Sequence, residues 1–210
     1  MASFDKKENE KRTITPDIAK ILGLTDEQQQ ELYVSDRDEI KDVVPVDKDG
    51  KESKAWGDTT DIKIVQIHFR LRSPGETVAL YRGWIVDVAN RKVICRSFPH
   101  TPSIDMKQMI ALAKKNTKAK IFQASEGTLI RAFKYAGQVF LSTHRRIHCS
   151  RSRFGDERMT FEEMFKEAAA AKKFEYGKNF KEGEVYIFFV VHAKNQMTNT
   201  EDVKPELFHV

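Results

Sequence analysis

The sequence predicts an α+β fold in which antiparallel sheets are covered by packed helices. Three observations predict it. Short alternating or continuous apolar stretches, typical of strands, fill the middle and the end of the chain. Turn signals separate several of these stretches by a few residues, which favours antiparallel hairpins. Capped helical segments occur before and between the strands without alternating regularly with them.

Composition sets the broad class of the protein. The 210 residues are enough for one large domain, or for one domain and an arm, and the 40% of apolar residues are enough for a packed core. The two cysteines lack the spacing of a zinc site, so we expect free thiols, no metal and an intracellular location in the cytoplasm, nucleus or a virion. The charged beginning of the chain argues against a signal peptide. The lack of a long apolar run argues against a membrane partner.

Residues 1–60 predict an acidic helical arm or subdomain. Thr15-Pro16 is typical of a helix start, and Gly23 is typical of its end. A capping-box pattern at 25–28 predicts a second helix that reaches about Tyr33. The residues that follow mix acids with turn signals.

Residues 61–195 are expected to form the main domain, which begins with strands. Alternating apolar residues over 62–71 predict a half-buried strand. Residues 78–88 and 92–98 predict a pair of strands, because Asn90 between them tolerates the left-handed conformation of a tight turn.

A helix and a hairpin are expected next. Apolar residues near helical spacing predict a helix capped by Ser103 that ends at Lys115. Strands are predicted at 129–133 and 139–142, with a glycine in the turn between them.

The last part of the chain predicts a helix, a strand and a tail. A capping box at 160–163 begins a helix to about Lys173. The nearly all-apolar run 185–191 predicts a central strand that is buried on both faces. Residues 196–210 predict an edge segment or tail.

Positive charge is concentrated between residues 114 and 153. This span contains ten Lys or Arg and one acid, Glu126. A hairpin with that imbalance can hold its cations on one face, where they attract phosphate, and Tyr135, Phe140 and Phe154 offer stacking surfaces for unpaired bases. The sequence therefore predicts DNA or RNA as the partner, although the arginines could instead pair with the acidic N-terminal region. The cations expected to bind are Lys114, Lys115, Lys118, Lys120, Arg131, Lys134, Arg145, Arg146, Arg151 and Arg153.

Three segments resemble the nucleotidyltransferase domain of ATP-dependent RNA ligases, DNA ligases and mRNA capping enzymes. The first is RGWIVD at 82–87 with KVICRSFP at 92–99, the second is EGTL at 126–129, and the third is VYIFFVVH at 185–192. The run STHRR at 142–146 also resembles a sequence of ligase-like proteins from large DNA viruses. The resemblance implies a ligase-like nucleotidyltransferase core over roughly residues 60–195.

The resemblance also implies that the covalent reaction is lost. The family's lysine, three residues before the motif glycine, attacks the α-phosphate of ATP, and this chain has Ala124 there. Phe189 stands where the third motif carries a carboxylate. We therefore expect a catalytically degenerate domain without a cofactor, in which a residual nucleotide pocket is formed by Arg82, Ala124, Glu126 and Gly127.

Two other functions stay open at this point. An active RNA ligase-like nucleotidyltransferase would use a lysine outside the motif, together with ATP and Mg. A scaffold or virion subunit would pair its apolar strand and tail with another chain, so that a homo-oligomer is one expected state.

Overall fold

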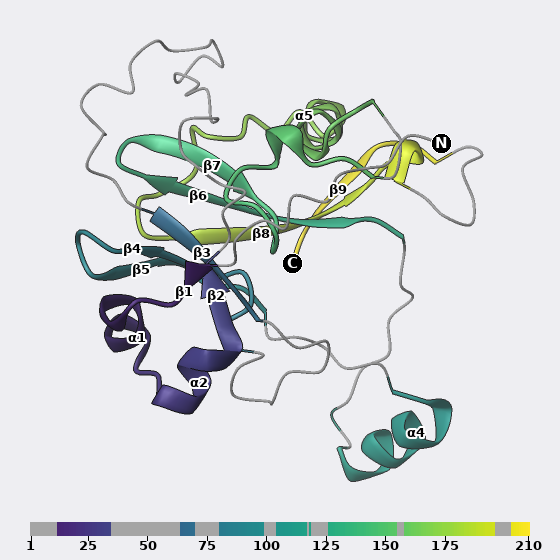
Figure 1. Ribbon diagram of the computed structural model, residues 1–210. Coiled ribbons are helices and arrows are strands. Elements are labelled where there is room, and N and C mark those ends of the chain that lie inside the picture. Colours follow the sequence, from purple (N-terminus) through teal and green to yellow (C-terminus); the bar gives the residue numbers. More distant parts are fainter. Residues whose placement is uncertain are drawn as a thin grey trace, which may run out of the picture.

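Two antiparallel sheets lie face to face in the computed structural model (Figure 1). The first sheet is 5-stranded with the order β1-β2-β3-β4-β5, and the second is 4-stranded with the order β7-β6-β8-β9. Helix α1 covers the outer side of the first sheet, and α5 covers the outer side of the second. The predicted α+β class with antiparallel sheets and packed helices is therefore confirmed. The structure describes residues 12–34, 64–69, 80–98, 104–116, 118, 126–154, 158–195 and 203–210.

The first sheet includes the described part of residues 1–60. Strand β2 pairs with β3, so this part of the chain belongs to the sheet and is not a separate arm. The helices α1 (Pro16–Leu22) and α2 (Asp26–Glu31) connect β1 to β2. The strands are β1 (Arg12–Thr13), β2 (Leu32–Val34), β3 (Ile64–Phe69), β4 (Ile85–Asp87) and β5 (Lys92–Cys95).

The predicted starts of both N-terminal helices are confirmed. Thr15 caps α1, which ends at Gly23 with φ 67°, and the capping box at 25–28 begins α2. The expectation that the second helix reaches Tyr33 is wrong. Leu32 is already extended, because the backbone pairs with β3 from that residue onward.

Two predicted strands of the first sheet differ from the structure. In the described part of the strand expected over 78–88, only β4 is present, because residues 80–83 form a turn. The strand expected to be half-buried contains Gln66 and Ile67, which are both buried although they point to opposite faces. Strand β3 is thus covered on both sides, by α1 and by the second sheet.

The second sheet is built on a hairpin of β6 and β7. Ala136 and Gly137, with φ of 50° and 75°, form the tight turn, so the predicted hairpin is confirmed. Strand β8 lies between β6 and β9, in the central position that its apolar sequence predicts. The segment expected to be an edge or tail contains β9, an edge strand. The strands are β6 (Thr128–Tyr135), β7 (Gln138–Ser142), β8 (Val185–Val191) and β9 (Glu206–His209).

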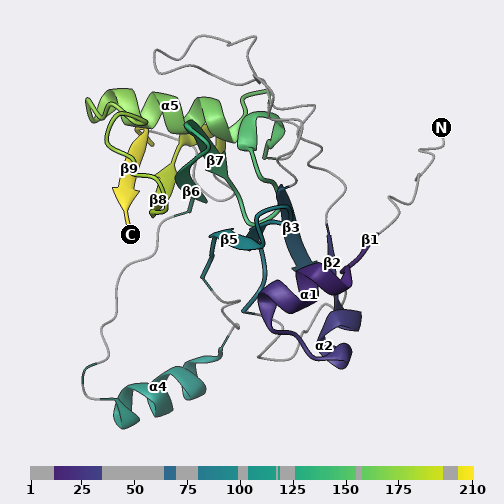
Figure 2. The same ribbon diagram turned by 90° about the vertical axis from the view of Figure 1, so that its left-hand side faces the viewer.

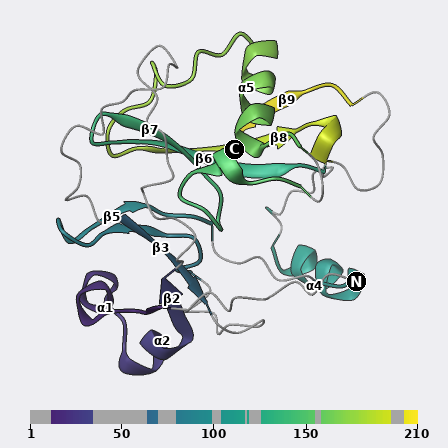
Figure 3. The same ribbon diagram turned by 45° about the horizontal axis from the view of Figure 1, so that its top comes forward.

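Helix α5 (Phe161–Ala171) crosses the strands of the second sheet on the side away from the first sheet (Figure 3). Its predicted capping box of Thr160 and Glu163 is present, and its buried residues pack in one apolar cluster with Ile130 and Ala132 of β6. Short 3-10 turns occur at η4 (Cys149–Arg151) and η5 (Ala193–Asn195).

Helix α4 (Met106–Lys115) lies apart from both sheets (Figure 2). Asp105 caps it, whereas the predicted cap Ser103 lies outside the described residues. None of its side chains is buried. Among the described residues, no helix combines the length and the apolar composition needed to cross a membrane.

Candidate functional site

Side chains of β6 alternate between the two faces of the second sheet. Arg131, Phe133 and Tyr135 face the first sheet. Phe133 lies in the apolar core between the sheets, and a polar contact to the first sheet lies on each side of it. The remaining buried members of this core are Ile85, Ile94, Cys95, Phe140 and Ile147.

Arg131 is a buried cation whose hydrogen bonds join three segments of the chain. Its side chain is 0% exposed. Nη1 donates to the carbonyl oxygens of Gly83 at 2.5 Å and Arg96 at 3.3 Å. Nη2 donates to the carbonyl oxygen of Thr143 at 2.7 Å and to Oγ of Ser142 at 2.8 Å. The planar guanidinium thus holds together the turn at 80–83, the end of β5 and the loop after β7.

The position of Arg131 corrects one prediction. Its guanidinium cannot reach a nucleic-acid phosphate, because it is enclosed between the sheets and bonded to protein oxygens. Burial lowers the pKa of Arg131, and the nearby Cys95 acts in the opposite direction. Its role is to position the segments around it.

Gln66 strengthens the same junction from β3. Its Nε2 donates to the Thr143 carbonyl at 2.7 Å and to the Gly83 carbonyl at 3.5 Å, so each of these oxygens accepts from both Gln66 and Arg131. Gly83 has φ 74°, and a Cβ atom there would lie 2.9 Å from Cα of His144. Glycine is therefore required for the turn at 80–83 to touch the loop after β7.

Thr143 shapes the loop after β7. Its N–H donates to the Arg146 carbonyl at 3.0 Å. Its Oγ1 accepts from the N–H of Arg145 at 3.2 Å and the N–H of Arg146 at 3.1 Å. A hydroxyl that accepts backbone N–H groups in this way fixes a tight turn. The side chain of Arg145 is exposed, and that of Arg146 is half-exposed.

Each segment held by Arg131 carries an arginine at or near the bonded carbonyl. Arg82 precedes Gly83, Arg96 supplies its own carbonyl, and Arg145 lies two residues after Thr143. Burial and the charge of Arg145 lower the pKa of Arg82. The guanidinium of Arg96 lies 5.1 Å from the centre of the Trp84 ring. The name arginine cluster is used below for Arg82, Arg96, Arg145 and Arg146.

Carboxylates do not neutralise most of this cluster within the described ranges. No ion pair with an acid there involves Arg96, Arg145 or Arg146. Arg82 and Arg145 experience each other's positive charge. This arrangement favours an anion close to the two loops.

The other predicted cations are distributed over several places. Lys134 forms an isolated β-bridge with Glu182, near the hairpin turn. Lys114 and Lys115 end helix α4, which lies apart from the sheets. Lys118 is exposed, whereas Lys120 lies outside the described residues.

Arg151 and Arg153 lie between β7 and α5. Arg151 ends η4 and is exposed. Arg153 is also exposed, and its backbone forms an isolated antiparallel β-bridge with Thr160, just before α5. Hydrogen bonds from Thr160 lower the pKa of Glu163, and the charge of Arg153 adds to this effect. Arg153 is therefore close to a carboxylate.

The residues of the expected nucleotide pocket have other surroundings. Ala124 lies outside the described residues, and Glu126 is half-exposed. A Cβ atom at Gly127 would collide with the carbonyl oxygen of Val190 and lie 2.8 Å from the Phe189 ring. Gly127 is thus required for the start of β6 to pack on β8, which accounts for this glycine without a bound phosphate. In the described parts of the chain, no three His, Cys, Asp or Glu side chains are grouped closely enough to hold a metal ion.

Two of the three aromatic residues expected to stack on bases have partners within the protein, whereas Phe154 is half-exposed. Phe140 is 4% exposed, and its ring stacks on Phe133 at 5.1 Å. The Tyr135 hydroxyl donates to Asp87. An exposed aromatic residue does occur beside the arginine cluster: Phe98, two residues after Arg96, is 48% exposed.

Sequence reasoning missed Arg96 and Phe98 as site residues. The signal that could have found them is the alternation of aromatic and cationic residues in 81–84 (YRGW) and 96–98 (RSF). Comparison with known proteins adds nothing to this signal, because no family model, curated protein or solved structure matches the chain. The functional assignment therefore depends on the arginine cluster and its surroundings.

Proposed function

We propose that this protein binds nucleic acid through phosphate groups at the arginine cluster, as a catalytically degenerate relative of ligase-like nucleotidyltransferases. The observation that carries the proposal is the set of hydrogen bonds by which Arg131 gathers three arginine-bearing segments. Guanidinium groups stay charged at neutral pH, and one guanidinium can donate two parallel hydrogen bonds to the oxygens of a phosphate. A cluster held in place before binding loses little conformational freedom when a phosphate arrives.

The charges behind the cluster support an anionic ligand. Arg131 makes its hydrogen bonds to carbonyl and hydroxyl oxygens, so its charge is not cancelled by a carboxylate among those partners. A bound phosphate would also relieve the repulsion between Arg82 and Arg145. Both effects favour binding that is insensitive to base sequence and weakens as salt rises.

The proposed activity is binding without covalent chemistry. A nucleotidylated intermediate needs an amine at the attacking position, and Ala124 has a methyl group there. Incubation with labelled ATP and Mg should therefore leave no protein-linked nucleotide, and such an adduct would favour the active nucleotidyltransferase instead.

Charge reversal tests the binding proposal directly. Arg145→Glu combined with Arg146→Glu should weaken binding to labelled oligonucleotides of about 20 nucleotides by more than tenfold, because two charge-assisted phosphate contacts become repulsive. Fluorescence anisotropy between about 50 and 200 mM salt should also show a shallower salt dependence, by about one to two units of log–log slope.

A matched control separates a local effect from net charge. Lys172→Glu combined with Lys173→Glu applies the same change in charge at exposed positions beyond α5. This variant should bind nearly as well as the wild type. Unchanged binding of the Arg145 and Arg146 variant would overturn the proposal, and so would an equal loss in the control.

A further inference from the structure

We infer that the nucleic acid at the arginine cluster is single-stranded, and that Phe98 stacks on one of its unpaired bases. This inference deepens the proposed function and rests on it. Cations bind the phosphates of duplexes and of single strands alike. A group that distinguishes the two forms must therefore recognise a feature that a duplex hides. The face of an unpaired base is such a feature.

Phe98 is held close to the arginine cluster by the chain itself. The carbonyl oxygen of Arg96 accepts a hydrogen bond from Arg131 at 3.3 Å, which fixes the start of this segment against the two loops. Two residues span at most about 7 Å, so the Cα atom of Phe98 cannot lie further than this from that of Arg96. This distance allows one strand to place a phosphate on the arginine cluster and a neighbouring base on the ring of Phe98.

The ring of Phe98 is available, whereas the neighbouring indole is not. Trp84 has the Arg96 guanidinium over its ring at 5.1 Å and the Tyr81 ring against it at 5.1 Å, with an angle of 65°. Within the described residues, no ring contact involves Phe98, and its side chain is 48% exposed. Trp84 thus positions Arg96, and Phe98 is left to contact a ligand.

An exposed phenylalanine beside cations discriminates between the two forms of nucleic acid. In a duplex the base faces are already stacked on one another, so the ring would gain no partner and would lie against a charged backbone. In a single strand every base offers a free face, whatever its identity. The juxtaposition of Phe98 with Arg96 therefore favours single strands without a strong sequence preference.

Phe208 provides a matched control for the loss of an aromatic ring. It is 43% exposed, close to the value for Phe98, but it lies on the edge strand β9 of the second sheet. Strand β9 pairs with β8 and forms the edge of that sheet opposite to β7 of the β6–β7 hairpin. Removal of Phe208 reports the general effect of deleting an exposed ring.

The experiment measures binding of oligo(dT), oligo(U) and duplex DNA and RNA of about 20 nucleotides or base pairs, by fluorescence anisotropy. The wild type should prefer single strands of either sugar to duplexes. Phe98→Ala should weaken single-strand binding by about 5- to 150-fold, Phe98→Trp should restore it, and Phe208→Ala should leave it unchanged. The salt dependence of Phe98→Ala should match the wild type, since no phosphate contact is removed.

The outcomes separate this inference from the proposed function. If Phe98→Ala binds like the wild type while the Arg145 and Arg146 variant loses binding, the stacking role is wrong and phosphate binding stands. Duplex binding as tight as single-strand binding would also overturn the inference. If the wild type binds none of the oligonucleotides, the proposed function itself fails. An unchanged melting temperature of Phe98→Ala establishes that a loss of binding is local.

Discussion

The two ends of the β6–β7 hairpin fasten the sheets together in opposite ways. At the turn end, the Tyr135 hydroxyl donates across to the buried carboxylate of Asp87 in the first sheet. Beside it, the Ala136 N–H donates to Glu182, in the loop before β8, at 2.8 Å. At the open end, Arg131 donates to carbonyl and hydroxyl oxygens. Acids thus accompany the polar groups at one end, whereas neutral acceptors accompany a buried cation at the other.

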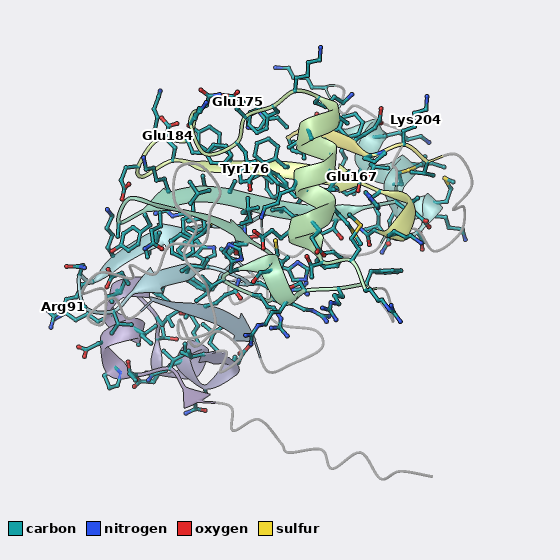
Figure 4. The ribbon with its side chains drawn as sticks, turned by 90° about the horizontal axis from the view of Figure 1, so that it is seen from above. Arg91, Glu167, Glu175, Tyr176, Glu184 and Lys204 are labelled. Atoms are coloured by element: carbon teal, nitrogen blue, oxygen red, sulfur yellow. The ribbon has the colours of Figure 1, made fainter. Side chains whose placement is uncertain are left out.

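We expect the location of acids, more than the number of cations, to decide where this protein binds an anion. The net charge of +5 is modest, and cations occur on many elements. Glu167, Glu175 and Glu184 lie on α5 and the loop that follows it, on the side away from the first sheet (Figure 4). The arginine cluster lies at the junction of the sheets, where Arg131 adds charge and brings no acid with it.

The largest expected effect comes from removing the cation at the open end. Arg131→Met should lower the free energy of unfolding by about 3 to 5 kcal/mol, because the buried carbonyl oxygens of Gly83 and Thr143 each lose a donor. Urea denaturation measures this loss. Lys134→Met, on the same strand but partly exposed, should change it by less than about 0.5 kcal/mol. Equal effects of the two substitutions would contradict the structural role of Arg131.

A smaller effect is expected at the turn end. Tyr135→Phe removes the hydroxyl that donates to Asp87, and should lower the free energy of unfolding by about 1 to 2 kcal/mol. The loss is smaller than at Arg131 because one hydrogen bond is removed here, whereas Arg131 makes four. Asp87 also keeps its hydrogen bonds from the backbone N–H of Asn90 at 2.9 Å and from its side-chain amide at 2.7 Å.

The same pair predicts a pH dependence of stability. Burial, the hydrogen bond to Asp87 and the charge of that carboxylate raise the pKa of Tyr135 from 10.0 to about 12. The neutral phenol is favoured in the folded state, so its contribution is complete below pH 10.0 and is lost as the pH rises towards about 12. The stability difference between wild type and Tyr135→Phe should therefore shrink over that range. A difference that grew above pH 10.0 would contradict this assignment.

Local features of this fold were predictable from the sequence, and its long-range contacts were not. The capping boxes and the tight hairpin turn depend on residues a few positions apart, so the sequence contains their signals directly. The strand predicted over 78–88 failed because its apolar pattern continues through Gly83, where the backbone turns with φ 74°. A hydrophobic pattern does not report such a turn.

The candidate site was predictable in part, for the same reason. Arg145 and Arg146 are identified by charge alone, but the inward orientation of Arg131 depends on acceptors 48, 35 and 12 residues away in the chain. An arginine in an alternating strand is expected to face solvent. Here the first sheet packs on that side of β6 and encloses Arg131. Arg96 was missed because its role is set by the same packing.

The smallest expected effect on stability belongs to Arg145, a member of the arginine cluster. Arg145→Gln removes an exposed cation close to Arg82, so the free energy of unfolding should change by less than about 0.5 kcal/mol. Binding of single-stranded oligonucleotides should nevertheless fall. Urea denaturation and anisotropy on the same preparation check both statements. A loss of stability comparable to that of Tyr135→Phe would mean that Arg145 supports the junction itself. Its repulsion with Arg82 would then reflect the packing of the two loops and would not support a phosphate-binding role.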